Sequence, residues 1–289
     1  MPSPLPTRIG PRTFTWGERT FVMGILNVTP DSFSGDGLLA GGDPVAAAVD
    51  RARRMVDEGA DLLDVGGEST RPGHAPVEAA EEIGRVIPVL AAVREALPDV
   101  PLSIDTTKAV VAEAALAAGA DLLNDVWGVG PDPAMAQLAA SAGVPLLVMH
   151  NREEPRYDDV VGEVVEDLRL ALERAERAGV RRDALIVDPG IGFGKTADHN
   201  VTLLGRLDAL TVLGRPILLG TSRKSTIGRI LGLPAEERLE GTLATTALGI
   251  ARGADLVRVH DVRANVRAAR VADAIVRGRW RSEPEGGPA

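Results

Sequence analysis

The chain has no cysteine, and this absence excludes disulfides, thiolate metal sites and cysteine nucleophiles. It also lacks long apolar runs, because no window approaches the ~18 apolar residues of a membrane-spanning helix. The first twenty residues lack the apolar stretch of a signal peptide. We therefore expect a cytoplasmic protein that does not bind membranes.

An excess of positive charge is missing as well. The net charge is −9 and the sequence pI is near 5.1, which argues against a nucleic-acid binder, since such proteins usually carry a basic face. Lysine is rare, with only Lys108, Lys195 and Lys224 among the 32 basic residues. A site for an anionic ligand needs local positive charge, so the arginines and these three lysines are its candidate cations.

One short sequence, Gly-Ala-Asp-Leu, occurs three times, at 59–62, 119–122 and 253–256. Each copy follows an alanine-rich helical pattern and precedes a short apolar run. Glycine suits the left-handed position that ends a helix, so each copy predicts a helix that turns into a strand.

Eight apolar segments of this kind alternate with helical patterns. Near-continuous apolar character is typical of parallel strands covered on both faces, and eight such units over about 250 residues favour a (β/α)₈ TIM barrel. A doubly wound open sheet is the alternative, but its G-x-G-x-x-G fingerprint is missing after the first strand. The expected strands are 21–27, 62–67, 102–106, 122–127, 145–150, 184–188, 216–221 and 256–260.

The two ends of the chain are predicted to lie outside the barrel. We expect residues 1–20 to form an N-terminal segment with a hairpin, 12–16 against 19–24 with a turn near Gly17, which could close one end of the barrel. The barrel itself is expected over 21–280. The polar, glycine-rich tail 281–289 is expected to be flexible.

Polar residues stand where the predicted strands end. The carboxyl ends of barrel strands meet at one mouth, where active sites lie, and unpaired buried carboxylates cost several kcal/mol. The mixture of acids and amides suits a heterocycle with adjacent donors and acceptors better than a metal cluster. These residues are Asn27, Asp64, Asp105, Asn124, Asp188 and Arg258, followed by His150 and His260.

Three other patterns are weaker evidence for a function. The segment 192–196 (Gly-Phe-Gly-Lys-Thr) resembles the end of a phosphate-binding loop, but Pro189 stands where the first glycine should be, so we expect a flexible loop. Ser222 and Ser225 have no evident His–Asp partners, which argues against a serine nucleophile. The hydroxyl-bearing segments 29–37 and 66–73 are candidate lids over the mouth.

Several long blocks of the sequence together carry a family resemblance. Met23-Gly-Ile-Leu-Asn-Val-Thr-Pro-Asp-Ser-Phe-Ser34 and Asp64-Val-Gly-Gly-Glu-Ser-Thr-Arg-Pro-Gly73 are similar to the first two signatures of the dihydropteroate synthases, a family of pterin-binding enzymes. The remaining blocks follow in the family's order: Ser103-Ile-Asp-Thr106, Asn124-Asp125, Asp188-Pro-Gly-Ile-Gly-Phe-Gly-Lys195, Ser222-Arg-Lys-Ser225 and Arg258-Val-His-Asp261. The resemblance covers nearly the whole chain.

The resemblance implies a transferase of folate synthesis that joins 6-hydroxymethyl-7,8-dihydropterin diphosphate to 4-aminobenzoate. It also implies Mg²⁺, a homodimer and inhibition by sulfonamides, with Asp105, Asp188, Lys224 and Arg258 as catalytic residues. The implied pterin site is Asp105, Asn124, Met149, Asp188, Lys224 and Arg258. The implied diphosphate site is Asn27, Thr70, Arg258 and His260, with Asn27 also on the metal. The implied aminobenzoate site is Thr70, Arg71, Pro72, Phe193 and Ser225.

Two segments depart from the family pattern. Gly35-Asp36-Gly37 stands where Asp-Gly-Gly is usual, so the lid carboxylate Asp36 is displaced by one position. Asn151-Arg152-Glu153 replaces a common Met-Arg/Gln-Gly. The resemblance assigns no role to Asp64. A pterin-binding methyltransferase of the corrinoid type and an inactive pterin-binding paralogue are the alternative functions.

Overall fold

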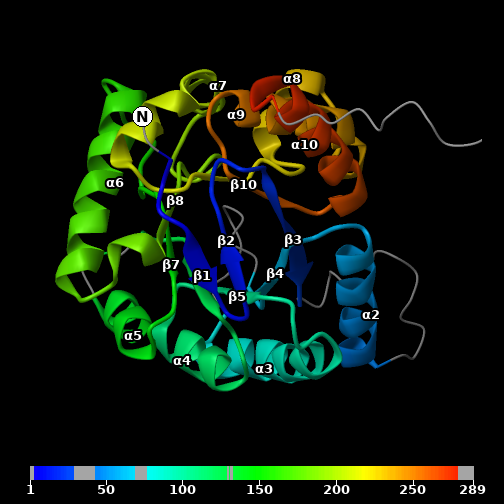
Figure 1. Ribbon diagram of the computed structural model, residues 1–289. Helices are drawn as coiled ribbons and strands as arrows, with labels where there is room; N and C mark the ends of the chain where they lie inside the picture. The colour runs from blue at the N-terminus through cyan, green and yellow to red at the C-terminus, as the bar shows by residue number, and fades with distance from the viewer. Residues whose placement is uncertain (1–2, 29–42, 69–76, 129, 131–132, 279–289) are drawn as a thin grey trace, which may run out of the picture.

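The computed structural model describes residues 3–28, 43–68, 77–128, 130 and 133–278. Its eight-stranded sheet is parallel throughout, with strand order β8-β7-β6-β5-β4-β3-β10-β9. A parallel bridge between Val187 and Ile217 joins the two ends of this order, so the sheet closes into a barrel with the helices outside it (Figure 1). The predicted barrel is confirmed, and the open-sheet alternative is wrong.

The strands and helices alternate along the chain. The barrel strands are β3 (Phe21–Asn27), β4 (Leu62–Gly66), β5 (Leu102–Asp105), β6 (Leu122–Asp125), β7 (Leu146–Met149), β8 (Leu185–Asp188), β9 (Leu218–Leu219) and β10 (Leu256–Val259). The helices are α2 (Pro44–Asp57), α3 (Ala79–Ala96), α4 (Ala109–Ala117), α5 (Ala134–Ala142), α6 (Val160–Arg177), α7 (Ala197–Gly205), α8 (Ser225–Leu231), α9 (Leu239–Ala251) and α10 (Val262–Val276). Each predicted strand segment therefore contains an observed strand, and α3 runs unbroken through Pro88.

The N-terminal hairpin is present, but its strands are not the predicted ones. Thr7–Ile9 (β1) pairs with Arg12–Phe14 (β2) in antiparallel fashion, around Gly10. That glycine has a φ of +54°, and an added Cβ would lie 2.4 Å from the carboxyl carbon of Asp121. The predicted pairing of 12–16 with 19–24 is wrong because β3 is already hydrogen-bonded to β4 and β10.

The hairpin closes the N-terminal end of the barrel. Ile9, Phe14 and Trp16 pack into one buried cluster with residues from the first half of the barrel strands, among them Leu62 and Leu256. The indole N–H of Trp16 donates a hydrogen bond to the hydroxyl of Thr7 at 2.9 Å, so the buried ring keeps a polar partner. The hairpin leaves the opposite end of the barrel, where the strands end, uncovered.

Side chains alternate between the barrel interior and the outer layer along each strand, because successive strand residues point to opposite faces. In β4, Leu62 belongs to the interior cluster and Leu63 to the outer core. The third residue, Asp64, therefore faces inward again. The repeated order of two apolar residues and one polar residue thus gives the barrel interior an apolar layer, with a layer of polar side chains next to it toward the carboxyl ends of the strands.

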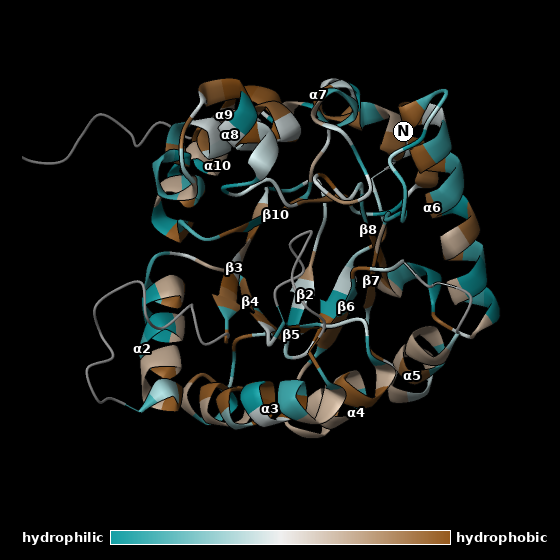
Figure 2. Cartoon of the chain, turned by 180° about the vertical axis from the view of Figure 1, so that it is seen from behind, coloured by the Kyte–Doolittle hydropathy of each residue, from teal (hydrophilic) through white to brown (hydrophobic). Residues whose placement is uncertain are grey.

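The outer core lies between the strands and the helices. In α6, buried residues recur at spacings of three and four from Val160 to Ala175, which gives the helix one apolar face. Figure 2 shows hydrophilic and hydrophobic residues alternating along this helix. Among the described residues, no helix is long and apolar enough to span a membrane.

Candidate active site

The polar ends of the strands gather at the mouth of the barrel, as predicted. Four of these side chains are at most 6% exposed: Asp64, Asp105, Asn124 and Asp188. Arg258 comes from β10 and is bonded to two of the carboxylates. Asp64 and Arg258, which lie 194 residues apart in the sequence, therefore belong to one hydrogen-bonded group with Asp105 and Asn124.

Arg258 holds this group together. Its Nε lies 2.5 Å from Oδ2 of Asp64, and its Nη2 lies 2.6 Å from Oδ2 of Asp105. The carboxamide nitrogen of Asn124 donates to the same oxygen of Asp64 at 3.1 Å. Asp64 is fully buried, so it orients Arg258 and Asn124. This gives Asp64 the role that the sequence alone did not assign.

Two carboxylate oxygens in the group have no partner. Among the buried side chains that the structure describes, Oδ1 of Asp64 and Oδ1 of Asp105 make no hydrogen bond. Burial raises the pKa of Asp105 to about 7, although Arg258 opposes that rise. An unsatisfied buried acceptor costs about 1–3 kcal/mol. A ligand that brings N–H groups to Asp105 would remove that cost.

Asp188 and Lys224 form the other side of the mouth. Oδ1 of Asp188 accepts a hydrogen bond from the backbone N–H of Gly190 at 2.7 Å, while burial raises the pKa of this carboxyl. Burial lowers the pKa of Lys224 to about 8, against the opposing effect of Asp188. Lys224 donates to the carbonyl of Ile191, and its Nζ lies 4.5 Å from the centre of the Phe193 ring.

A backbone turn positions Lys224. Arg223 has a φ of +56°, a conformation that costs a non-glycine residue about 1–2 kcal/mol. Its N–H donates to the hydroxyl of Thr242 at 3.0 Å, and its guanidinium pairs with Asp261. Arg238 binds its carbonyl at 3.0 Å. These bonds hold the turn after β9, where Ser222 and Lys224 lie on either side of Arg223.

Lys195 does not serve a phosphate loop. Its Nζ lies 3.0 Å from the carbonyl oxygens of both Gly190 and Phe193 and 2.8 Å from Nδ1 of His150. Burial lowers the pKa of Lys195 to about 7. The lysine therefore ties the loop that carries Phe193 to the end of β7. Sequence reasoning missed this role, although the rarity of lysine had singled the residue out.

The segment after β7 that differs from the family pattern, Asn151-Arg152-Glu153, is bound to α6 through its arginine. Arg152 pairs with Glu163 and Asp167, and its guanidinium lies 4.5 Å from the centre of the Tyr157 ring. The hydroxyl of Tyr157 donates to the carbonyl of Gly194 at 2.8 Å. Arg152 thus supports the loop that carries Phe193 from outside the mouth, through its contact with Tyr157.

His150 and His260 differ in their surroundings. Both ring nitrogens of His150 are engaged, Nε2 with Asp167 at 3.0 Å and Nδ1 with Lys195, so His150 is a structural residue. Nδ1 of His260 lies 2.9 Å from the hydroxyl of Ser222. Ser222 therefore has a histidine partner, which the sequence did not reveal because β9 and β10 are neighbours only in the folded barrel. No described carboxylate bonds to His260, so the pair is not a Ser-His-Asp triad.

The other predicted site residues divide into two groups. Asn27 ends β3 and is half-buried, Met149 belongs to the interior cluster with Phe193 packed against it, and Ser225 begins α8. Thr70, Arg71, Pro72 and the displaced Asp36 lie outside the described residues. Within the described chain, no group of three or more acidic or histidine side chains is placed to hold a metal ion.

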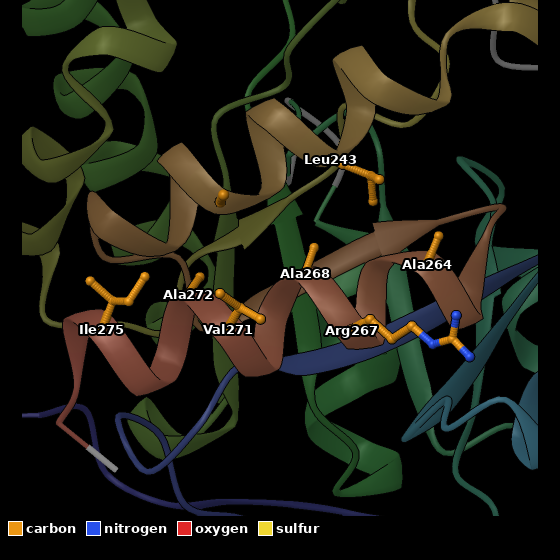
Figure 3. A pocket seen from close by; sticks show the side chains of 8 residues that line it. Leu243, Ala264, Arg267, Ala268, Val271, Ala272 and Ile275 are labelled. Carbon is orange, nitrogen blue, oxygen red and sulfur yellow. The ribbon is translucent and has the colours of Figure 1, made fainter. Parts of the chain in front are cut away.

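An apolar groove of about 590 Å³ lies outside the barrel, between α9 and α10. Figure 3 shows Leu243 of α9 and Val271 and Ile275 of α10 beside it. Val271 and Ile275 are 62% and 77% exposed. The groove contains none of the polar strand ends and is separate from the mouth.

Comparison with known proteins gives a consistent result. Residues 23–260 match the family model of the pterin binding enzyme. The chain is 51% identical over 271 residues to the dihydropteroate synthase of Clostridium beijerinckii, covering 93% of this chain and 99% of that one.

Solved structures of dihydropteroate synthases have a similar fold. The fold is similar to that of dihydropteroate synthase from Xanthomonas albilineans with 4-aminobenzoic acid, with a TM-score of 0.88, 45% identity, and coverage of 95% of this chain and 98% of that one. It is also similar to the Xanthomonas albilineans enzyme in complex with 7,8-dihydropteroate, with a TM-score of 0.85, 43% identity, and coverage of 94% and 98%.

Proposed function

The chain belongs to the dihydropteroate synthases of the pterin-binding enzyme family, and from this premise we propose that its barrel mouth joins 6-hydroxymethyl-7,8-dihydropterin diphosphate to 4-aminobenzoate. The products are 7,8-dihydropteroate and diphosphate. The observation that carries the proposal is the buried group around Arg258, which leaves an acceptor oxygen of Asp105 unpaired at the mouth. The alternative of a corrinoid-type methyltransferase is not favoured, since the chain falls among the dihydropteroate synthases.

The pterin ring would bind among the acids and the amide. A carboxylate can accept two N–H bonds from a 2-amino group and a ring nitrogen, whereas an amide supplies one donor and one acceptor. Asp105 and Asp188 are the carboxylates of this site and Asn124 is the amide. Met149, in the interior cluster, would lie under the ring, with Lys224 beside it.

The leaving diphosphate needs positive charge and hydrogen-bond donors. Arg258 supplies a guanidinium that stays charged, because Asp64 and Asp105 hold its pKa above the usual range. Asn27, His260 and Thr70 would complete the diphosphate site. Stabilising charge on the departing oxygen lowers the barrier to breaking the C–O bond.

The arylamine then takes the place of the diphosphate. The C–O bond breaks with its electron pair on the diphosphate oxygen, and the amine nitrogen forms the new C–N bond and releases a proton. A neutral arylamine needs no strong base, which agrees with a mouth built from hydrogen-bonding groups. Phe193, Ser225, Thr70, Arg71 and Pro72 would form its site, where sulfonamides would compete.

Mg²⁺ would be held by Asn27 together with the diphosphate. The donor set fits this ion, because Mg²⁺ is usually bound by one or two protein oxygens, waters and substrate phosphates. The carboxamide oxygen of Asn27 lies at the mouth beside Gly66. A Cβ added to that glycine would lie 3.9 Å from this oxygen. When bound, Mg²⁺ would neutralise charge on the leaving group.

We also propose a homodimer formed through the α9–α10 groove. The exposed side chains of Val271 and Ile275 would be covered by a second copy of the chain. Ala264 and Ala268, which line the same groove, would allow the helices to approach closely. Exposed apolar patches of this kind mark association surfaces.

The reaction is tested by an assay of diphosphate release from the pterin diphosphate, with and without 4-aminobenzoate. We expect release that depends on the arylamine, and formation of 7,8-dihydropteroate in equal amount. Asp188→Asn should weaken pterin binding by about 1.5–3 kcal/mol, the value of hydrogen bonds to a charged group. Pterin binding without any turnover would instead identify the inactive paralogue.

A further inference from the structure

Ser222 and His260 make two hydrogen bonds to each other across β9 and β10. The backbone N–H of His260 donates to Oγ of Ser222 at 3.1 Å. The same Oγ lies 2.9 Å from Nδ1 of the imidazole. Ser222 is buried, with 6% of its surface exposed.

These contacts decide where the imidazole proton is. Oγ already accepts the backbone N–H, so its own hydrogen needs an acceptor. Among the described residues, Nδ1 of His260 is the acceptor within reach of that hydroxyl. If Nδ1 instead carried the proton, Oγ would accept twice and its buried hydrogen would have no partner, at a cost. Nδ1 is therefore unprotonated, and the neutral ring carries its hydrogen on Nε2.

The charges around His260 keep the ring neutral. Burial lowers its pKa, and Arg223, Arg258 and Arg51 lower it further, while Asp261 opposes them, so that the pKa falls to about 3. No described residue bonds Nε2, in contrast to His150, whose two nitrogens are both engaged. His260 is thus a neutral ring with one N–H donor free for a ligand.

We propose that Ser222 is a positioning residue that fixes His260 in the Nε2–H tautomer, so that the ring donates a hydrogen bond to the diphosphate of the substrate. This inference rests on the proposed function for the assignment of the diphosphate to His260. A freely tautomerising ring would present a lone pair to the phosphate oxygens for part of the time, and that contact is repulsive. The hydroxyl of Ser222 removes this unproductive state before the substrate binds.

The tautomer can be observed directly. The chain has four histidines, so long-range ¹H–¹⁵N spectra of ¹⁵N-histidine-labelled protein are simple, and His260→Gln assigns the ring. At pH 7 we expect the Nδ1 signal of an unprotonated nitrogen and the Nε2 signal of a protonated one, with His150 showing the same pattern. A proton on Nδ1 of His260 in the unmodified protein overturns the proposal.

The consequence for binding is tested with Ser222→Ala. Loss of the hydroxyl should change the nitrogen pattern of His260 and weaken the binding of Mg²⁺-diphosphate by about five- to tenfold, the equivalent of one neutral hydrogen bond. Affinity for a pterin without diphosphate should not change. Ser141→Ala, which removes an exposed hydroxyl far from the mouth, is the matched control. Unchanged diphosphate affinity in Ser222→Ala overturns the role of the serine.

The binding of diphosphate to His260 and the positioning role of Ser222 are tested by different variants. If His260→Gln binds Mg²⁺-diphosphate as tightly as the unmodified protein, the assignment of the diphosphate to His260 is wrong, and the inference falls with it even where the spectrum shows the expected tautomer. If His260→Gln weakens binding and Ser222→Ala does not, the diphosphate site stands and the positioning role of Ser222 is wrong. Thermal unfolding of each variant shows whether it is folded.

Discussion

Asp64 and Arg258 form an ion pair inside the barrel mouth, with Nε of the arginine 2.5 Å from Oδ2 of the fully buried aspartate. The two residues come from β4 and β10, which lie on either side of β3. A charge buried this deeply is tolerated only when it is paired. The site therefore depends on a carboxylate that the substrate does not need to touch.

Asp64→Asn should reduce both stability and ligand binding. Breaking a buried ion pair costs about 3–5 kcal/mol, and we expect the lower end of that range because Arg258 keeps its contact with Asp105. Urea unfolding measures the loss, and calorimetry with a pterin measures the affinity. Asp208→Asn, which removes an exposed pair with Arg252, should cost less than about 1 kcal/mol. Equal effects of the two substitutions would contradict this reading of Asp64.

Lys195→Met should act on the arylamine more than on the pterin diphosphate. The substitution leaves an unbranched apolar side chain only one atom shorter and removes the bonds to the carbonyls of Gly190 and Phe193, so the loop that carries Phe193 loses its anchor. We expect the KM for 4-aminobenzoate to rise by about five- to tenfold, from the loss of one or two hydrogen bonds. Steady-state kinetics with each substrate varied in turn measures the two effects. Arg181→Met, on an exposed turn, should change neither, and equal rises for both substrates would argue against the anchor.

The His260 ring should make stability depend on pH. Its pKa is about 3 in the folded protein and 6.5 in the unfolded chain, so between these values the unfolded chain binds a proton that the folded one does not. The stability contributed by this ring is complete above pH 6.5 and decreases as the pH falls toward 3. The slope is at most about 1.4 kcal/mol per pH unit.

The comparison with His260→Gln isolates this ring from the other titrating groups. Denaturant unfolding of both proteins at pH 5, 6 and 7.5 gives the difference in their free energies of unfolding. That difference should shift in favour of His260→Gln as the pH falls. A difference that stays constant over this range would show that the ring binds a proton as readily in the folded protein as in the unfolded chain, so that its pKa is not lowered by folding.

Asn27→Ala should affect metal binding only together with diphosphate. Because Asn27 is expected to supply one oxygen and the diphosphate the rest, Mg²⁺ should bind weakly to the ligand-free protein and well to its diphosphate complex. The substitution should weaken that ternary complex, as calorimetric titration of Mg²⁺ with and without diphosphate would show. Tight binding of Mg²⁺ to the ligand-free protein that persists in Asn27→Ala would refute the assignment.

Val271→Glu should disrupt the proposed homodimer. Val271 is 62% exposed and lies beside the groove between α9 and α10 (Figure 3), so a carboxylate there would be buried against an apolar face in a dimer. We expect a shift from dimer to monomer in analytical ultracentrifugation. Val201→Glu, at a 48% exposed site on α7, is the control. A Val271→Glu protein that remains dimeric would place the interface elsewhere.

The barrel and its polar mouth were determined by the sequence. Two apolar residues followed by a polar one, as in Leu62-Leu63-Asp64, fix which residue faces the interior, because the alternation along a strand is local. The glycines that end the helices mark the start of β4, β6 and β10 for the same reason. The inward-facing positions and the helix ends can therefore be predicted without knowing which residues the side chains contact in the folded protein.

The partners themselves were decided only by the tertiary structure. Three pairs join residues from different strands and loops: Asp64 with Arg258, Lys195 with His150, and Ser222 with His260. Closure of the barrel sets the distances within these pairs. The hairpin shows the same limit: the sequence around Gly17 suggested a turn, but β3 was already engaged by β4 and β10. Which strands compete for a partner is a property of the closed sheet, and no local pattern encodes it.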